Sequence, residues 1–357
     1  MGLHRPLATY YPDDVSALVI DVLGATVAIT GPPEALDSLR GALADLVPPT
    51  SVKRATTGDR ELALVPAGRG FDLRDDGRVV RRDVDPSVAA ATVVWRLNAI
   101  AGESTAHVLL HAGCVAGPRG GAVLLPGGPG AGKSTLAAAC VAAGLTYVSD
   151  ELAAIDVRTG GLAPYAKPLG LSGGRLVAAG TLGRVVAQGP AGVPTPVALV
   201  FPRYKSEAPV TEVPLDSTWA LLALTTHATN LAAMGGTALA WLAGLALSCP
   251  AVHVTYGDAG KALVAVERAA AAPARPVAPA AILPRITDET TTVPVDDALA
   301  VLHEPTGKVH LLNATAADVW RRATGASSDP DADPVTTAAT VDQLVRVGLL
   351  GEAAGAR

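Results

Sequence analysis

The sequence is poor in aromatic and in charged residues, which make up 3% and 17% of its 357 residues. Basic side chains are not in excess either, because the formal net charge is -5 at pH 7. Proteins that bind nucleic acids regardless of sequence need a basic surface, so no nucleic-acid partner is expected. Hydrophobic residues make up 49% of the chain, which excludes the composition of a disordered protein and allows two or three domains with cores.

Cysteines and long apolar runs are also scarce. Cys114, Cys140 and Cys249 lie far apart and form no C-x-x-C pair, so we interpret them as small buried hydrophobic residues in a reducing compartment. The first residues, MGLHRPLATYYPDD, lack the apolar core of a signal peptide, and the apolar stretch 238–248 is too short to span a bilayer. A soluble, cytoplasmic protein with no membrane partner is therefore predicted.

Four segments differ in pattern. Residues 1–103 predict a small N-terminal α+β lobe with two hairpins and two helices, the second helix at 86–101. Residues 104–268 alternate between apolar strands and helices. Residues 269–285 are rich in Ala and Pro, which is typical of a semi-rigid linker. Residues 286–357 predict a separate small domain of two short strands, joined by a Thr-Gly turn, and two helices.

The second segment predicts an α/β fold. An apolar strand at 121–127 is followed by a glycine-rich turn, a helix that ends at Gly144, and a strand at 145–150. This order is typical of a parallel sheet covered by helices. The remaining elements expected there are strands at 107–117, 196–201 and 251–257 and helices at 216–231 and 236–248.

The stretch 127–134, GGPGAGKS, matches the phosphate-binding P-loop pattern G-x-x-x-x-G-K-[ST]. Glycines adopt positive φ readily, so successive N–H groups can point into one concavity and hold phosphate oxygens at a helix N-terminus. Lys133 is expected to reach the β- and γ-phosphates, and Ser134 to ligate Mg²⁺. The alternative is a strand-to-helix turn that binds nothing. The predicted nucleotide-binding residues are Gly127, Gly128, Gly130, Ala131, Gly132, Lys133, Ser134 and Thr135.

Two adjacent carboxylates, Asp150 and Glu151, follow the next predicted strand. Open α/β sheets bind ligands at the carboxyl ends of their strands, so both are expected near the phosphates. One could hold Mg²⁺ while the other takes the proton from an attacking hydroxyl, and the sequence does not assign the two roles. The alternative is an acidic turn with a capping role.

Three further side chains could take part in phosphoryl transfer. His111 follows an apolar strand that could lie beside the P-loop strand, where an imidazole could contact the phosphoryl group or the incoming hydroxyl. Lys167 and Arg203 lie in proline-bracketed turns and could neutralise phosphate charge. The alternatives are a structural histidine and two solvated surface cations.

These motifs together resemble the catalytic domain of bacterial HPr kinase/phosphorylase, and more closely its divergent HPr-kinase-like relatives. HAGCVAG, GGPGAGKSTLAAACVAAGLTYVSDE and YAKPLGL carry the resemblance, which covers about 105–260. It implies a P-loop kinase that uses a nucleoside triphosphate and Mg²⁺ to phosphorylate a serine hydroxyl, with His111, Lys133, Asp150 and Glu151 catalytic. Glu151 stands where the family usually has aspartate, and the family's downstream Arg-Gly signature is missing. These two departures argue against HPr as the substrate and against the phosphorolysis reaction.

The C-terminal segment resembles a PqqD-like peptide-recognition domain of winged-helix type, through VLHEPTGKVHLLNATAADVW and LVRVGLL. Such domains bind a leader peptide as an added strand at a sheet edge. The resemblance implies that residues 286–357 capture the leader of a precursor peptide; the alternative is a purely structural appendage.

The combined prediction is an ATP-dependent (or GTP-dependent) kinase with Mg²⁺, acting on a serine-type hydroxyl of a ribosomally synthesised precursor peptide, as in the tailoring of lasso-type peptides. Two alternatives stay open, a small-molecule kinase with a protein-interaction domain and a non-catalytic nucleotide-binding partner in a biosynthetic complex. HPr kinases assemble as oligomers, so a homo-oligomer is possible by resemblance.

Overall fold

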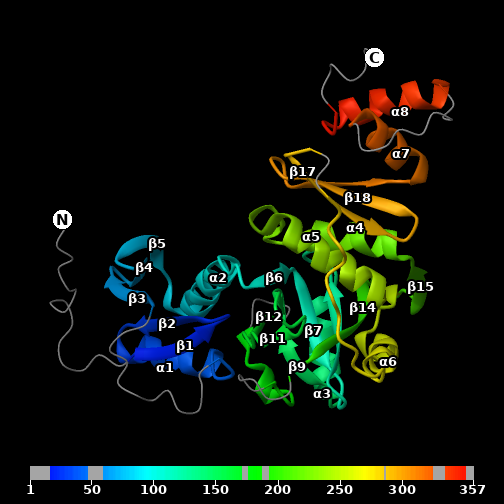
Figure 1. The fold of residues 1–357 in the computed structure, drawn as a ribbon. Helices are drawn as coiled ribbons and strands as arrows, with labels where there is room; N and C mark the ends of the chain where they lie inside the picture. Colours follow the sequence, from blue (N-terminus) through cyan, green and yellow to red (C-terminus); the bar gives the residue numbers. More distant parts are fainter. Residues whose placement is uncertain are drawn as a thin grey trace, which may run out of the picture.

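The computed structural model describes residues 17–46, 59–170, 176–186, 193–284, 287–324 and 334–350, the side chains of 334–338 excepted. The protein is a mixed α/β structure with several sheets (Figure 1). The extreme N-terminal stretch, the first residues of the expected hairpin at 15–30 and the last residues of the C-terminal segment lie outside the described residues.

The N-terminal lobe contains a five-stranded sheet in the order β1-β2-β3-β4-β5 with two helices packed on it. Both expected hairpins form, with positive φ at Leu23-Gly24 and at Asp76-Gly77. Strands β2 and β3 run parallel, and the other pairs are antiparallel. The elements are β1 Ala17–Val22, β2 Ala25–Thr30, α1 Pro33–Ala42, β3 Arg60–Ala67, β4 Gly70–Asp75, β5 Arg78–Val84, a 3-10 turn Pro86–Val88, and α2 Ala89–Gly102.

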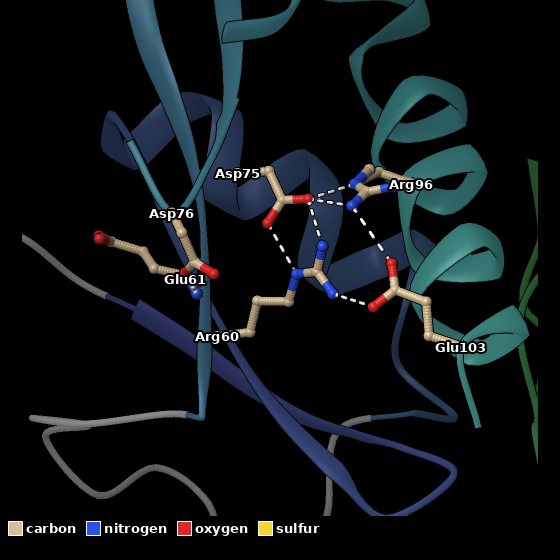
Figure 2. Close-up of polar contacts among 6 residues, drawn as sticks. All are labelled: Arg60, Glu61, Asp75, Asp76, Arg96 and Glu103. Carbon is tan, nitrogen blue, oxygen red and sulfur yellow. Dashed lines mark hydrogen bonds and ion pairs between the residues drawn. The ribbon is translucent and has the colours of Figure 1, made fainter. Parts of the chain in front are cut away.

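A paired charge network ties α2 to this sheet (Figure 2). The nearly buried carboxylate of Asp75 accepts hydrogen bonds from Arg60 on β3, at 2.7 and 2.9 Å, and from Arg96 on α2. Glu103 closes the network by pairing with Arg60 at 2.5 Å and Arg96 at 3.6 Å. Burial would raise the pKa of Asp75, but its hydrogen bonds and ion pairs with the two arginines lower it below the ordinary value.

A small sheet separates the lobe from the rest of the molecule. It comprises β6 His107–Leu110, β10 Ala153–Asp156 and β11 Leu162–Ala163, in the order β11-β10-β6. Val108 and Leu110 belong to the core around the central sheet, whereas Leu109 belongs to the core of the lobe. Successive side chains of a strand point to opposite faces, so this sheet is a wall shared by two cores.

The central sheet has six strands in the order β15-β16-β14-β8-β7-β9. It is mixed, which corrects the expectation of a parallel sheet: β8 and β9 do run in the same direction, but β7 lies antiparallel between them. The predicted strand 107–117 is in fact two strands, and only the part after His111 pairs with β8. The bounds are β7 Ala112–Ala116, β8 Gly121–Pro126, β9 Thr146–Ser149, β14 Thr195–Tyr204, β15 Thr211–Leu215 and β16 Ala251–Tyr256.

Helices cover both faces of the central sheet. One face packs against α3 Lys133–Ala142 and α6 Ala259–Ala270, and the other against α4 Ser217–His227 and α5 Leu231–Ser248. All three cysteines are free and buried in these cores, as predicted, and burial raises the pKa of Cys140 and Cys249 to about 12. The short remaining elements are β12 Leu169–Gly170, β13 Leu176–Val177 and a 3-10 turn Ala179–Thr181.

Helix α5 is longer than the sequence predicts, because the expected helix 236–248 continues back to Leu231 across a kink at Gly235 (φ 54°). Within the part of the chain that the structure describes, α5 alone has the length and hydropathy to cross a membrane. In this fold it is a core helix, with 56% of its residues buried between the central sheet and the C-terminal strands.

The C-terminal segment packs directly on α4 and α5 (Figure 1). Its sheet has one strand more than predicted, β17 Thr290–Val295, beside β18 Ala298–His303 and β19 Lys308–Leu312. Val293, Val295 and Leu302 share a core with α5, so the segment is not structurally detached. Its other face is covered by α7 Ala314–Ala323 and α8 Pro334–Arg346.

The Ala/Pro-rich stretch before this sheet lies along α5. Val277 is buried in the central core, and Ala280 N–H donates a hydrogen bond of 2.9 Å to the Ala240 carbonyl. These contacts hold the connection in place against α5.

Candidate functional site

Five functional side chains and loops meet at one edge of the central sheet. Strands β8, β9, β14 and β16 run in one direction, so the glycine loop (residues 127–132), Asp150, Tyr204 and Tyr256 occupy their carboxyl ends. Strand β7 runs the opposite way, so His111, which precedes it, lies at the same edge. This convergence brings together residues that are 145 positions apart in the sequence, from His111 to Tyr256.

A cavity of about 710 Å³ opens at this edge. That volume is within the usual range for sites that bind small molecules or cofactors. Its lining residues are His111, Pro129, Gly130, Gly132, Lys133, Ser134, Thr135, Glu151, Gly170, Tyr204, Tyr256, Gly257 and Ala259.

The glycine loop connects β8 to α3 and requires its glycines. Gly130 and Gly132 have φ values of 79° and 92°, in the left-handed region that favours glycine. A Cβ on Gly132 would also lie 2.2 Å from the Tyr256 hydroxyl oxygen. Helix α3 begins directly afterwards at Lys133, and the N–H groups of a first helical turn have no acceptor within the helix. The loop and helix therefore form an anion site that faces the cavity.

Lys133 is held beside His111 at the cavity wall. Its Nζ lies 3.0 Å from His111 Nε2 and donates a hydrogen bond of 2.9 Å to the Gly128 carbonyl. Burial, followed by the charge of Lys133, lowers the pKa of His111, which favours the neutral imidazole as acceptor for the ammonium. Burial also lowers the pKa of Lys133. The lysine thus has a neutral neighbour and is desolvated, and both raise its attraction for an anion in the cavity.

Asp150 and Ser134 lie behind the loop. The Ser134 hydroxyl donates a hydrogen bond of 2.8 Å to Asp150 Oδ2, while Asp150 Oδ1 is buried and has no hydrogen-bond partner among the described residues. A buried carboxylate oxygen without a partner is costly unless a ligand or cation satisfies it. Together the hydroxyl and carboxylate oxygens suit Mg²⁺, which takes its other ligands from phosphates and water.

Glu151 faces the cavity on a strained backbone, with φ 75° and a side chain that is 45% exposed. Its Oε2 accepts hydrogen bonds of 3.0 Å from Lys167 Nζ and 3.0 Å from Asn98 Nδ2. Burial alone would raise the pKa of Glu151, but these partners lower it below its ordinary value. Glu151 is therefore ionised at neutral pH and held in one orientation.

Lys167 supports the two acids from behind. It is buried, lies 3.8 Å from Asp150 Oδ2, and donates a hydrogen bond of 3.1 Å to the Pro168 carbonyl. Its own carbonyl accepts a hydrogen bond of 2.9 Å from the Tyr147 hydroxyl. Lys167 does not line the cavity in the described structure. It balances the charge of the acids, where the sequence suggested a contact with phosphate.

Arg203 also stays outside the described lining of the cavity. It is exposed on β14, one residue before Tyr204, and neighbouring strand residues point to opposite faces of a sheet. Tyr204 lines the cavity instead, beside Tyr256 of the adjacent strand, with ring centroids 6.0 Å apart.

The structure adds four residues that the sequence did not single out: Asn98, Tyr165, Tyr204 and Tyr256. The tyrosines at the strand ends could have been found, because each ends an apolar strand at the sheet edge expected to bind ligand. Asn98 had no such signal, since it lies on a helix of the N-terminal lobe.

Compared with known protein families and with curated proteins, the sequence matches none of them.

Proposed function

We propose that this chain is a P-loop kinase of the HPr-kinase-like type, which transfers the γ-phosphoryl group of ATP or GTP to a serine-type hydroxyl of a ribosomally synthesised precursor peptide. The observation that carries the proposal is one cavity that joins an anion site to an acid. Lys133 and the start of α3 line it on one side, and Glu151 lines it on another. Phosphoryl transfer needs little more than such positioning and charge stabilisation.

On this proposal the phosphates bind to the glycine loop and Lys133. Ser134 and Asp150 would hold the Mg²⁺ that accompanies the nucleotide, which supports Asp150 as the metal-side acid. The metal would neutralise charge on the phosphates. Lys133 stabilises the charge that develops on the transferred group, and burial in the cavity wall strengthens this interaction.

Glu151 is the group placed to take the proton of the attacking hydroxyl. It lines the cavity, whereas Asp150 is buried, and this difference supports Glu151 as the base and Asp150 as the metal ligand. Lys167 and Asn98 keep Glu151 ionised and oriented. A carboxylate held in this way accepts a proton within hydrogen-bond distance of a bound hydroxyl.

The C-terminal segment supports a peptide acceptor. One face of its three-stranded sheet packs on α4 and α5, and the other is covered by α7 and α8. With both faces covered, the outer strand β19 offers its edge for strand addition in the described part of the chain, whereas the Thr292 carbonyl of β17 already accepts a hydrogen bond from Leu283 N–H. Capture of a leader peptide there raises the local acceptor concentration to about the millimolar range.

Mass spectrometry tests the proposal directly. A candidate precursor peptide with its leader is incubated with the full chain, ATP and Mg²⁺, and a mass increase of one phosphate on a hydroxyl residue is expected. The same peptide without its leader should show a strongly raised KM with little change in kcat, and a scrambled leader is the control. Equal KM values for all three peptides would favour the small-molecule kinase, and ATP binding without any transfer would favour the non-catalytic alternative.

A further inference from the structure

The cavity extends beyond the glycine loop toward two tyrosines that the phosphoryl-transfer chemistry does not use. Tyr204 and Tyr256 end the neighbouring parallel strands β14 and β16 and are directly paired in the sheet. Their rings meet edge to face, at an interplanar angle of 65°, and Tyr204 is 51% exposed. A half-exposed aromatic ring in a cavity wall is a stacking surface that the described residues leave open.

The order of strands separates this surface from the acids. Strand β8, which leads into the glycine loop, has β14 and β16 on one side and β7 and β9 on the other. His111 and Asp150 therefore lie to one side of the loop and the tyrosines to the other. Neighbouring strands are about 4.8 Å apart, so Tyr204 lies one strand and Tyr256 two strands from the loop. A nucleotide whose phosphates occupy the loop, with its reacting end toward the acids, extends its base toward the tyrosines.

The tyrosines are fixed to the loop itself. Tyr256 donates its hydroxyl to the Gly132 carbonyl at 3.0 Å, and Tyr204 N–H donates to the Ala131 carbonyl at 3.0 Å. Burial raises the pKa of Tyr256 to about 12, so this hydroxyl keeps its proton and remains a donor to the loop. The distance between the stacking surface and the phosphate site is thereby set by the fold.

The chemistry of the lining indicates how a base would be recognised. On this side the described lining consists of Tyr204, Tyr256, Gly257 and Ala259, with no charged or amide side chain among them. Adenine and guanine differ in the donors and acceptors at their edges, but both present an aromatic face. A site whose described lining offers an aromatic ring and no charged or amide side chain binds the face of the base, which both purines share.

We infer that Tyr204, supported by Tyr256, forms a nucleobase subsite that stacks purine bases and does not distinguish ATP from GTP. This inference rests on the proposed function, since it takes the glycine loop to hold the phosphates. Base–aromatic stacking is worth about 1–3 kcal/mol per base, which corresponds to about a fivefold to 150-fold change in affinity. Edge recognition by a buried polar group would instead separate the two nucleotides by orders of magnitude.

Calorimetric titration of the full chain with Mg²⁺ and ATP, GTP or inorganic tripolyphosphate tests the inference. We expect ATP and GTP to bind the wild type with Kd values within about threefold of each other. Tyr204→Ala should weaken both by about tenfold or more and leave tripolyphosphate unchanged, because the N–H of residue 204 still donates to the Ala131 carbonyl of the loop. Tyr204→Phe should retain most of the affinity, and Lys205→Ala, an exposed neighbour, is the matched control.

Three results would overturn the inference. An ATP affinity unchanged in Tyr204→Ala removes the stacking role, and an equal loss of tripolyphosphate binding makes Tyr204 a support of the loop instead. A large preference for one nucleotide shows edge recognition. In each of these cases the wild type still binds tripolyphosphate, so the phosphate site stands; a wild type that binds neither tripolyphosphate nor ATP rejects the proposed function as well.

Discussion

Two clusters of charged side chains lie on either side of α2, and they are built in opposite ways. In the N-terminal lobe, Asp75 has both oxygens bonded to Arg60 and Arg96, and Glu103 completes the network (Figure 2). At the sheet edge, Asp150 leaves one buried oxygen without a partner in the described structure, and Lys133 has a neutral histidine beside it.

On the proposed function, the difference separates charges that stabilise the fold from charges that bind a ligand. A buried ion pair is costly to break when all its members are satisfied, because removal of one leaves the others desolvated and unpaired. A buried charge without partners is already unfavourable, so its removal costs the fold little. The same kind of substitution should therefore act on stability in the lobe and on activity at the sheet edge.

The largest effect is expected from Asp75→Asn. It leaves Arg60 and Arg96 partly buried without their shared carboxylate, which should lower the free energy of unfolding by about 3–5 kcal/mol. Chemical denaturation measures the loss, and Asp37→Asn, which breaks an exposed pair with Arg40, is the matched control with an expected loss below about 1 kcal/mol. Equal losses in the two variants would show that the network adds no more than a surface pair.

Lys133→Ala should have the corresponding effect on activity. Loss of a preorganised charge in the site is worth roughly 3–4 kcal/mol of transition-state stabilisation, which is a decrease of about 100-fold to 1000-fold in turnover. Its unfolding free energy should change far less than that of Asp75→Asn, because the two hydrogen-bond partners of Lys133, the Gly128 carbonyl and a neutral His111, are uncharged. Lys205→Ala is the control in the same kinase assay, and normal turnover by folded Lys133→Ala would reject the phosphate-site assignment.

The acid dependence of stability should also distinguish the lobe. The pKa of Asp75 is held below its ordinary value of 3.8 in the folded state, so its contribution is complete above that value and is lost as the pH falls through the lower folded-state pKa. The stability difference between wild type and Asp75→Asn should therefore be constant from pH 7 to about 5 and shrink below pH 4. Denaturation at a series of pH values measures it; a difference that grows on acidification would contradict the paired carboxylate.

Asp150→Asn reverses the pattern of Asp75→Asn. The amide oxygen can still accept the hydrogen bond from Ser134, and the unpartnered Oδ1 has no bond to lose. Lys167 loses its 3.8 Å pair with Asp150 but keeps the 3.0 Å pair with Glu151, so the free energy of unfolding should fall by less than about 2 kcal/mol. Phosphoryl transfer should fall by about 100-fold or more, because the negative charge on the metal side is gone. Denaturation and the kinase assay on one preparation measure both. A loss of stability as large as that of Asp75→Asn would show that Asp150, like Asp75, mainly stabilises the fold.

The sequence predicts most elements here because their signals are local. The hairpin turns, the strand ends and the start of α3 depend on glycine conformations and on neighbouring apolar residues. Strand β7 lies between β8 and β9, and this pairing depends on contacts between segments distant in the sequence. No pattern within the three strands encodes it. Strand β17 was missed because TTTVPV contains a proline and no charged residue to mark an exposed face.

The candidate site divides in the same way. The glycine loop, His111 and the two acids lie close together as their positions after strands predict. The sequence predicted Arg203, not Tyr204, as the phosphate-binding residue of this strand. Neighbouring residues of a strand point to opposite faces, so the register of the strand decides which of the two faces the cavity, and a single sequence does not fix that register. Lys167 was expected to contact the phosphates. In the structure it pairs instead with Asp150 and Glu151, because buried carboxylates need a neighbouring cation.

The smallest effect is expected where the lobe meets the site. The Tyr165 hydroxyl donates a hydrogen bond of 2.9 Å to Asn98 Oδ1, and Asn98 in turn donates to Glu151. Tyr165→Phe keeps the buried ring and removes this bond, so Asn98 stays in place but is less firmly oriented. A neutral hydrogen bond contributes about 0.5–1.5 kcal/mol, so kcat should fall by up to about tenfold with little change in the KM for ATP. Asn98→Ala should reduce kcat further, because it removes the contact with Glu151 itself. If the two variants instead leave kcat unchanged, α2 connects the lobe to the site mechanically and Lys167 alone orients Glu151.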